Sequence, residues 1–230
     1  MPDQVTIDQV LTEFLADQRA RLSARTMRNY EDVISLFQDC MNGYGPNTLD
    51  GRDHHRWKKA FDGGDFGAYC HLLGPEYILD NAGEFLGYFM IRKVMAGQEL
   101  LRAAGTVTKR LAAWLCENGY AGEEERDRAA ESGTAAARDL PRAEELADLL
   151  YRQSRAARFA GPPAQGGKVI DDQLMIERAE PGAIYFEGGI GPVPVPSQAA
   201  ALATPGWRVT IVLAEQADGW EIAEVGNVYP

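Results

Sequence analysis

The densest group of side chains that could do chemistry is a basic run around one tryptophan. His54-His55-Arg56-Trp57-Lys58-Lys59 places cations on both sides of an aromatic ring. Cations follow a phosphate backbone while a ring stacks or packs, so this run is the strongest local signal for nucleic acid. A solvated helix face explains the same composition. The sequence alone leaves both interpretations open.

More basic side chains lie elsewhere in the first half of the chain. The net charge of the whole chain is −11, and the last 65 residues contribute −6 of it. Because an acidic surface repels phosphates, we expect any nucleic acid to be contacted through amino-terminal cations. The expected contacts are Arg19, Arg21, Arg25, Arg28, Arg56, Lys58, Lys59, Lys109 and Arg110.

Motifs for metals, cofactors and catalysis are weaker. Cys70-His71 and His54-His55 are adjacent pairs of metal-ligand types, but no Cys-x-x-Cys spacing accompanies them, and structural zinc sites need two spaced pairs. The chain has no Gly-x-Ser-x-Gly elbow, no P-loop and no Gly-x-Gly-x-x-Gly pattern at the start of a helix. We therefore predict no metal, no cofactor and no enzymatic activity.

Cysteine usage and hydropathy indicate the compartment. Cys40, Cys70 and Cys116 are odd in number and widely spaced, which predicts reduced, buried thiols and not a disulfide framework. No stretch approaches the roughly 18–20 apolar residues of a membrane span, and the first residues lack the pattern of a signal peptide. We expect a cytoplasmic protein that does not enter membranes.

The cations of the first half must be positioned by amphipathic helices. Thr6 and Gln9 have the spacing of a capping box, which predicts a first helix over residues 7–21. Ser23 caps a second helix, and Gly43 is predicted to end it. The short connection between them predicts a helical hairpin.

Later helices are less regular. Residues 83–95 are apolar nearly all round, which predicts a buried helix. Gly105 is predicted to end the next segment, with a new helix following it. The polar residues 121–139 are expected to form a connector or a solvated helix face. Pro141 suits the first turn of a separate helix over residues 141–159.

Two stretches resemble the core-binding, or SAM-like, amino-terminal domain of tyrosine recombinases and phage integrases. Leu22-Ser23-Ala24-Arg25-Thr26-Met27-Arg28-Asn29-Tyr30 looks like the helix-opening motif of that domain. Gly105-Thr106-Val107-Thr108-Lys109-Arg110-Leu111, followed by Trp114-Leu115 and Gly119-Tyr120, is similar to its later helix. The resemblance extends over about residues 6–120 and is interrupted between Gly45 and Pro75. It implies a helical bundle that docks on DNA.

The resemblance does not include the catalytic domain of those enzymes. All three histidines lie within the first 71 residues, and Tyr229 has no Arg/His cluster near it in sequence. A tyrosine needs such a cluster to act as the nucleophile on a phosphate. The resemblance therefore implies DNA docking without strand cleavage.

The periodicity changes from helix to strand after a Pro/Gly-rich segment at residues 161–167. Five short strands are predicted beyond it, with a helical turn between the third and the fourth. This order suits a small, partly open β-barrel, OB-like or SH3-like, and slightly favours OB-like. Its rings are expected to pack mainly in the core.

These patterns predict an α+β protein of two domains. A helical domain spans residues 1–160, a linker spans 161–167, and a β-barrel spans 168–230. The leading hypothesis is a non-enzymatic DNA-associated protein, with double-stranded DNA bound by the helical domain and the barrel as an accessory or protein-binding part. The alternative is a protein–protein interaction module or adaptor without nucleic-acid binding. An enzyme acting on a small ligand between the domains comes third.

Overall fold

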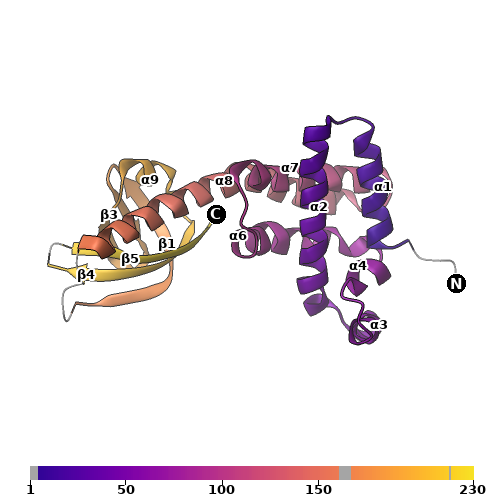
Figure 1. Ribbon diagram of the computed structural model, residues 1–230, viewed down its shortest axis with the longest axis horizontal. Helices are drawn as coiled ribbons and strands as arrows, with labels where there is room; N and C mark the ends of the chain where they lie inside the picture. Colours follow the sequence, from indigo (N-terminus) through magenta and orange to yellow (C-terminus); the bar gives the residue numbers. More distant parts are fainter. Residues whose placement is uncertain (1–4, 161–166, 218) are drawn as a thin grey trace. The chain divides into compact units, whose positions relative to one another are not determined.

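The structure, a computed structural model, describes residues 5–160, 167–217 and 219–230. It is a mixed protein of helices and one antiparallel sheet (Figure 1). The chain divides into two compact units, Met1–Arg138 and Asp139–Pro230. The first unit is helical and the second contains the sheet. Most of the expected linker, residues 161–166, lies outside the described residues.

The first unit is built from α-helices joined by short 3-10 and π segments. Its elements are α1 (Ile7–Arg19), α2 (Ala24–Tyr44), η1 (Gly45–Thr48), α3 (Gly51–Asp62), α4 (Ala68–Leu72), η2 (Pro75–Tyr77), η3 (Leu79–Asn81), α5 (Ala82–Glu84), η4 (Phe85–Phe89), α6 (Met90–Arg92), α7 (Gln98–Glu117) and the first part of α8 (Glu123–Ala160).

The helix starts predicted at Thr6 and Ser23 are confirmed. The Thr6 hydroxyl accepts a hydrogen bond from the Gln9 amide at 3.4 Å, and the Thr6 amide donates to Gln9 Oε1 at 3.0 Å. This capping box satisfies two amides that the helix itself leaves without partners. At the start of α2, Ser23 Oγ accepts from the Thr26 amide at 3.2 Å. The two helices form the expected hairpin.

Both helix ends that were predicted from glycines are wrong. α2 continues through Gly43 and ends at Tyr44, and α7 continues through Gly105. At Gly105 the reason is packing, because a Cβ atom there would lie 2.3 Å from the carbonyl oxygen of Gly133 and 2.4 Å from the amide nitrogen of Ala137 in α8. The glycine permits a close helix crossing and does not interrupt α7.

Aromatic rings fill the core of the helical unit. The Phe14 ring lies 6.0 Å from the Tyr30 ring and 5.6 Å from the Trp114 ring, which joins α1, α2 and α7. The Phe37 and Phe85 rings stack at 4.7 Å. Phe85 belongs to the π-helical segment η4, within the segment predicted to be a buried helix. That segment is buried on one side only.

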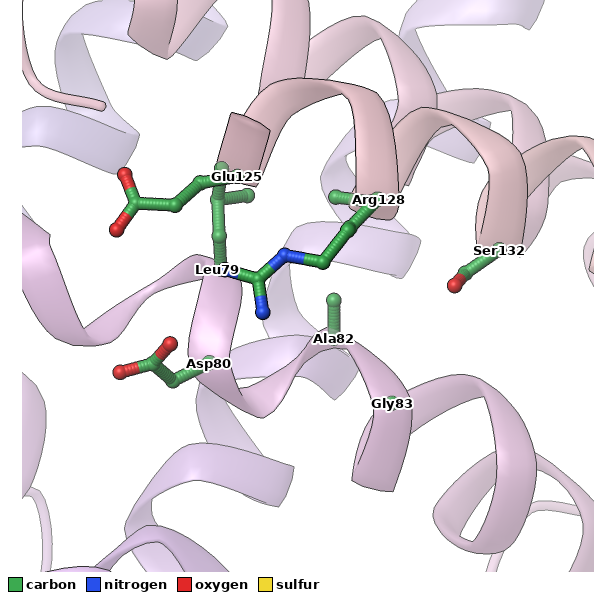
Figure 2. Close-up of a pocket in the computed structure, with 8 residues that line it drawn as sticks. Leu79, Asp80, Ala82, Gly83, Glu125, Arg128 and Ser132 are labelled. Carbon is green, nitrogen blue, oxygen red and sulfur yellow. The ribbon is translucent and has the colours of Figure 1, made fainter. Parts of the chain in front are cut away.

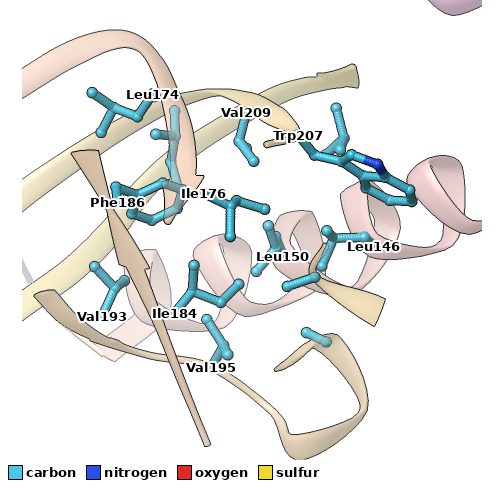
Figure 3. Packing of buried hydrophobic residues seen from close by; sticks show 14 of the residues in the cluster. Leu146, Leu150, Leu174, Ile176, Ile184, Phe186, Val193, Val195, Trp207 and Val209 are labelled. Atoms are coloured by element: carbon cyan, nitrogen blue, oxygen red, sulfur yellow. The ribbon is translucent and has the colours of Figure 1, made fainter. Parts of the chain in front are cut away.

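The helix α8 differs from the prediction in two ways. The expected connector and the expected separate helix are one continuous helix, with Pro141 inside it. The residues after Arg138 belong to the second unit, where the side chains of Leu146 and Leu150 are fully buried against the sheet (Figure 3). In this division residues 139–160 go with the sheet, because this part of the helix supplies apolar surface that the sheet needs to form a core.

The second unit contains five antiparallel strands in the order β3-β2-β1-β4-β5. β1 pairs with β4 through its first half and with β2 through its second half. The strands and connecting helices are β1 (Val169–Glu180), β2 (Ala183–Phe186), η5 (Glu187–Gly189), β3 (Ile190–Pro194), α9 (Ser197–Leu202), β4 (Arg208–Gln216) and β5 (Gly219–Tyr229).

The predicted small, partly open β-barrel is confirmed only in part, because the five strands form one antiparallel sheet that is not closed into a barrel. No backbone pairing between described residues joins the two edge strands β3 and β5. The apolar face of the sheet is covered by α8 and α9, and Figure 3 shows Leu146 and Leu150 facing the strands. The predicted core role of the rings holds for Phe186 and Trp207.

Candidate nucleic-acid interface

The nine expected contact residues do not form one surface. α3 lies at the end of α2 that is remote from the turn between α1 and α2 (Figure 1). α2 has 21 residues, which corresponds to a length of about 31 Å. One end carries Arg19, Arg21, Arg25 and Arg28, the other end carries Arg56, Lys58 and Lys59 on α3, and Lys109 and Arg110 lie on α7.

The cations near the helical hairpin turn are largely neutralised by carboxylates. Arg25 Nη2 lies 2.8 Å from Glu99 Oε2, and Asn29 donates a second hydrogen bond to the same carboxylate at 3.1 Å. The hydrogen bond from Arg25 lowers the pKa of the Glu99 carboxyl, so this carboxylate stays charged. The other ion pairs are Arg19 with Glu31, Arg21 with Asp17, and Arg110 with Glu117.

Two expected cations in this region have no such partner. Arg28 and Lys109 form no ion pair with any residue that the structure describes. Arg28 follows the paired Arg25 by one helical turn, so a phosphate approaching the hairpin end would meet carboxylates as well as cations. We do not assign the candidate interface to this end.

The helix α3 is different, because none of its side chains is buried. It carries four cations and two carboxylates. Arg56 and Lys58 form ion pairs with Asp53 and Asp62 on the same helix, at 3.3 and 3.0 Å. Exposed pairs of this kind contribute only about 0.3–0.5 kcal/mol, so an incoming phosphate can replace the carboxylates.

Two further cations of α3 are unpaired within the described part of the chain, Arg52 and Lys59. Arg52 was missed as a contact residue by the sequence analysis. The signal that could have found it is helical spacing, since it lies four residues before Arg56 and seven before Lys59. The three side chains therefore share one face of the helix.

A row of aromatic rings runs along the other face of α3, away from Arg52, Arg56 and Lys59. The His54 and Trp57 rings lie 5.5 Å apart, Trp57 and Phe61 5.3 Å, and Phe61 and Phe66 5.5 Å. Phe61 is 37% exposed and Phe66 is 74% exposed. The sequence analysis noted Trp57 but missed both phenylalanines. Their exposure depends on where α4 lies, which periodicity does not reveal.

The loop that presents Phe66 is held by hydrogen bonds on both sides. The Asp65 amide donates to the carbonyl oxygen of Ala60 at 3.1 Å, and Asp65 Oδ1 accepts from the Gly67 amide at 3.0 Å. The same carboxylate oxygen lies 3.0 Å from His71 Nδ1. Phe66 is therefore exposed by a fixed backbone.

We call this region the α3 surface. It consists of the four cations of α3, which are Arg52, Arg56, Lys58 and Lys59.

A small pocket in the helical unit is the candidate for a catalytic site. It has a volume of about 180 Å³, and its lining includes Asp80, Glu125, Arg128 and Ser132 but no histidine, cysteine or lysine. Figure 2 shows the Arg128 side chain extending between the two carboxylates. One cation between two carboxylates leaves no positive charge for an anion, and the Ser132 hydroxyl has no histidine in this lining to activate it. The pocket therefore supports no catalytic assignment.

Two of the three cysteines are unsuited to reactivity or metal binding. All three are free; Cys40 and Cys70 are buried, and burial raises the pKa of each thiol to about 12. Both therefore stay protonated at neutral pH, whereas a metal ligand or nucleophile must be a thiolate. Among the residues that the structure describes, no group of three His, Cys, Asp or Glu side chains could hold a metal ion.

Comparison with known proteins identifies no relative. No protein-family model, no curated protein and no solved structure matches the chain. In the described ranges, no helix combines the length and the apolar character needed to span a bilayer. The α3 surface is therefore the feature from which we infer function.

Proposed function

We propose that this chain is a non-enzymatic, nucleic-acid-associated protein that contacts phosphates through the α3 surface. The observation that supports this most directly is a helix without a buried side chain that carries four cations and two carboxylates, in a chain of net charge −11. Arg52 and Lys59 have no ion-pair partner among the described residues. Concentrated, unpaired positive charge is what a phosphate backbone requires.

The resemblance to the core-binding domain of recombinases gives secondary support. The residues that carry the resemblance form the start of α2 and the middle of α7. α3 lies in the interval between Gly45 and Pro75, where the sequence departs from that family. We propose that this chain shares a helical scaffold with those domains but binds through its own inserted helix.

The second unit has an accessory role in this proposal. Its strand order and the helix α9 between β3 and β4 support an OB-like connectivity in an open sheet. OB-like folds bind nucleic acid through basic grooves, whereas residues 166–230 carry only three cations and nine acidic side chains. A protein partner suits this acidic unit better than nucleic acid does.

The second candidate is an adaptor that binds protein only. It is favoured by one specific observation: six of the nine expected cations are ion-paired with carboxylates of the chain. An acidic protein whose cations are already paired would avoid nucleic acid.

Salt-dependent binding separates the two candidates. Fluorescence anisotropy of the full chain with labelled nucleic acid of mixed sequence, single-stranded and duplex, should show an affinity that falls between about 50 mM and about 200 mM salt. The double change Arg52→Ala and Lys59→Ala should weaken binding. Arg25→Ala is the matched control, because Arg25 is paired with Glu99 at the other end of α2.

The outcome that contradicts the proposal is equally definite. If neither nucleic acid binds at about 50 mM salt, where electrostatic binding is strong, nucleic-acid association is refuted. The adaptor is then the better description. If binding occurs but Arg25→Ala weakens it as much as the α3 variants do, the interface has been assigned to the wrong end of the helical unit.

A further inference from the structure

We infer that two copies of this chain associate through the aromatic side of α3, as an antiparallel pair of α3 helices. We call this side the ring face. Its exposed members are Phe61 and Phe66, and Trp57 lies half-buried beside them. The inference goes beyond the proposed function, because it concerns a different side of the helix and a different partner.

Helix geometry separates the ring face from the cations. At about 100° per residue, Arg52 and Lys59 lie about 140° and 160° round the helix from Trp57. Phe61 lies only about 40° from Trp57. A nucleic acid held by the cations would therefore leave the rings uncovered, and the ring face is available to a second occupant.

The rings are exposed and held in place. Phe66 is 74% exposed and Phe61 is 37% exposed, and the two rings meet edge-on at 5.5 Å. The backbone that presents Phe66 is fixed by the Asp65 carboxylate, which accepts a hydrogen bond from the Gly67 amide at 3.0 Å. Aromatic side chains are enriched at protein–protein interfaces, and rings that are already ordered lose little freedom on binding.

The charges beside the rings are complementary to a second copy of the same surface. Lys58 and Asp62 form an ion pair at 3.0 Å, and both side chains are 58% exposed. They lie about 60° and 100° round the helix from Phe61, on the side away from Trp57. A two-fold axis perpendicular to α3 and level with Ala60 makes the two helices antiparallel, which brings Lys58 of each copy level with Asp62 of the other. Opposite charges then meet on one flank of the contact, and the rings of both copies meet on the other flank.

Other arrangements of two copies are less favourable. In a parallel pair of helices, Lys58 would lie level with Lys58 and Asp62 with Asp62, so like charges would be opposed. The chain as a whole has a net charge of −11, so two copies repel each other unless their contact balances charge locally. The antiparallel contact does so through the same two side chains.

The contact is small, so the dimer is expected to be weak. A buried aromatic side chain contributes about 150–250 Å², and the exposed fractions of Phe61 and Phe66 together equal about one whole ring per copy. Contacts that bury less than about 1,200 Å² belong to weak or transient complexes. We therefore expect a dissociation constant of about 10 µM to 1 mM.

Sedimentation equilibrium of the full chain, from about 10 µM to about 1 mM, measures this association. The wild type should shift from monomer toward dimer over the range. Phe66→Ser should weaken dimerisation about a hundredfold, because each lost ring contact corresponds to about tenfold and the change is present in both copies. Tyr151→Ser is the matched control, because Tyr151 is a 49% exposed ring on α8. The double change Arg52→Ala and Lys59→Ala should leave dimerisation unchanged.

Charge reversal tests the antiparallel arrangement. Lys58→Asp places carboxylates on both sides of the contact, and Asp62→Lys places ammonium groups on both sides, so each variant should be monomeric by itself. An equimolar mixture of the two variants should form a heterodimer, because each copy then presents the charge that the other lacks. Both variants lose the ion pair within their own helix, so recovery in the mixture comes from contact between copies.

Three results would overturn the inference. The first is a wild-type chain that stays monomeric up to about 1 mM, which would leave the ring face to a different protein. The second is a dimer that Phe66→Ser leaves intact, and the third is a mixture of the charge variants that does not associate. None of them affects the proposed function, which is measured by nucleic-acid binding. Circular dichroism of each variant checks its fold, which changes at side chains this exposed should leave intact.

Discussion

Replacing Gly105 by alanine tests the close packing of α7 against α8. In most helices this change is favourable, since alanine stabilises a helix interior by about 1 kcal/mol relative to glycine. At Gly105 the new methyl group would lie 2.3 Å from the carbonyl oxygen of Gly133 and 2.4 Å from the amide nitrogen of Ala137. Both obstructing atoms belong to the backbone, so no side-chain rotation can make room.

The size of the effect follows from these distances. Carbon atoms prefer non-bonded separations of about 3.5 Å, so α7 and α8 would have to move apart by about 1 Å. Overpacking of this kind costs about 1–3 kcal/mol, and backbone obstruction puts Gly105 at the upper end. After the helix-propensity gain, we expect the free energy of unfolding to fall by about 2 kcal/mol, which lowers the melting temperature by about 4–8 °C.

Thermal and urea unfolding followed by circular dichroism would measure this change. The matched control is Gly43→Ala, because Gly43 lies inside α2 and a methyl group there would meet no atom of another element within 4 Å. That variant should be more stable than the wild type by up to about 1 kcal/mol. If Gly105→Ala is stabilised as much as Gly43→Ala, the two helices do not approach as closely as described, and the reasoning is refuted.

Burial and hydrogen bonding lead to three further expectations. Leu146→Ala should reduce the stability of the second unit by about 2–5 kcal/mol in urea unfolding; an unchanged midpoint would show that this part of α8 is not in the sheet's core. Burial raises the pKa of both buried thiols to about 12, so in the native protein at mildly alkaline pH only the partly exposed Cys116 should react with a thiol reagent. All three thiols should react after denaturation, and three fast-reacting native thiols would contradict the described core. The buried Asn81 amide donates to the Tyr69 hydroxyl at 3.0 Å, so Asn81→Ala should cost about 1–3 kcal/mol of stability, whereas a loss just as large for the exposed Asn47→Ala would show that the bond is not the cause.

The local structure of this protein could be predicted well from sequence. Thr6 with Gln9 and Ser23 with Thr26 stabilise helix starts through contacts within one turn, so their spacing is sufficient to locate them. The five strands were likewise recognisable from alternation and turn residues. These features depend on residues close together in the chain.

Glycine and proline were less reliable guides because their effect depends on neighbours distant in sequence. The residues next to Gly105 predict a helix end there. In the structure the backbone of α8 lies against Gly105 and leaves no room for a side chain. Pro141 is read as a helix start, but α8 continues through it. The core of the sheet has the same origin, since Leu146 and Leu150 of α8 pack among its apolar side chains.

At the candidate site, too, some features follow from the sequence and others depend on the tertiary structure. The order of residues is enough to establish that the chain is acidic, that its amino-terminal half is helical, and that cations gather around Trp57. Folding determines which of those cations keep their charge available: Glu99 neutralises Arg25 from 74 residues away, while Lys59 has no carboxylate partner among the described residues. The physical reason is the separation along the sequence of the residues that interact. Capping hydrogen bonds and periodicity involve residues a few positions apart, whereas ion pairing and ring exposure depend on how distant segments pack.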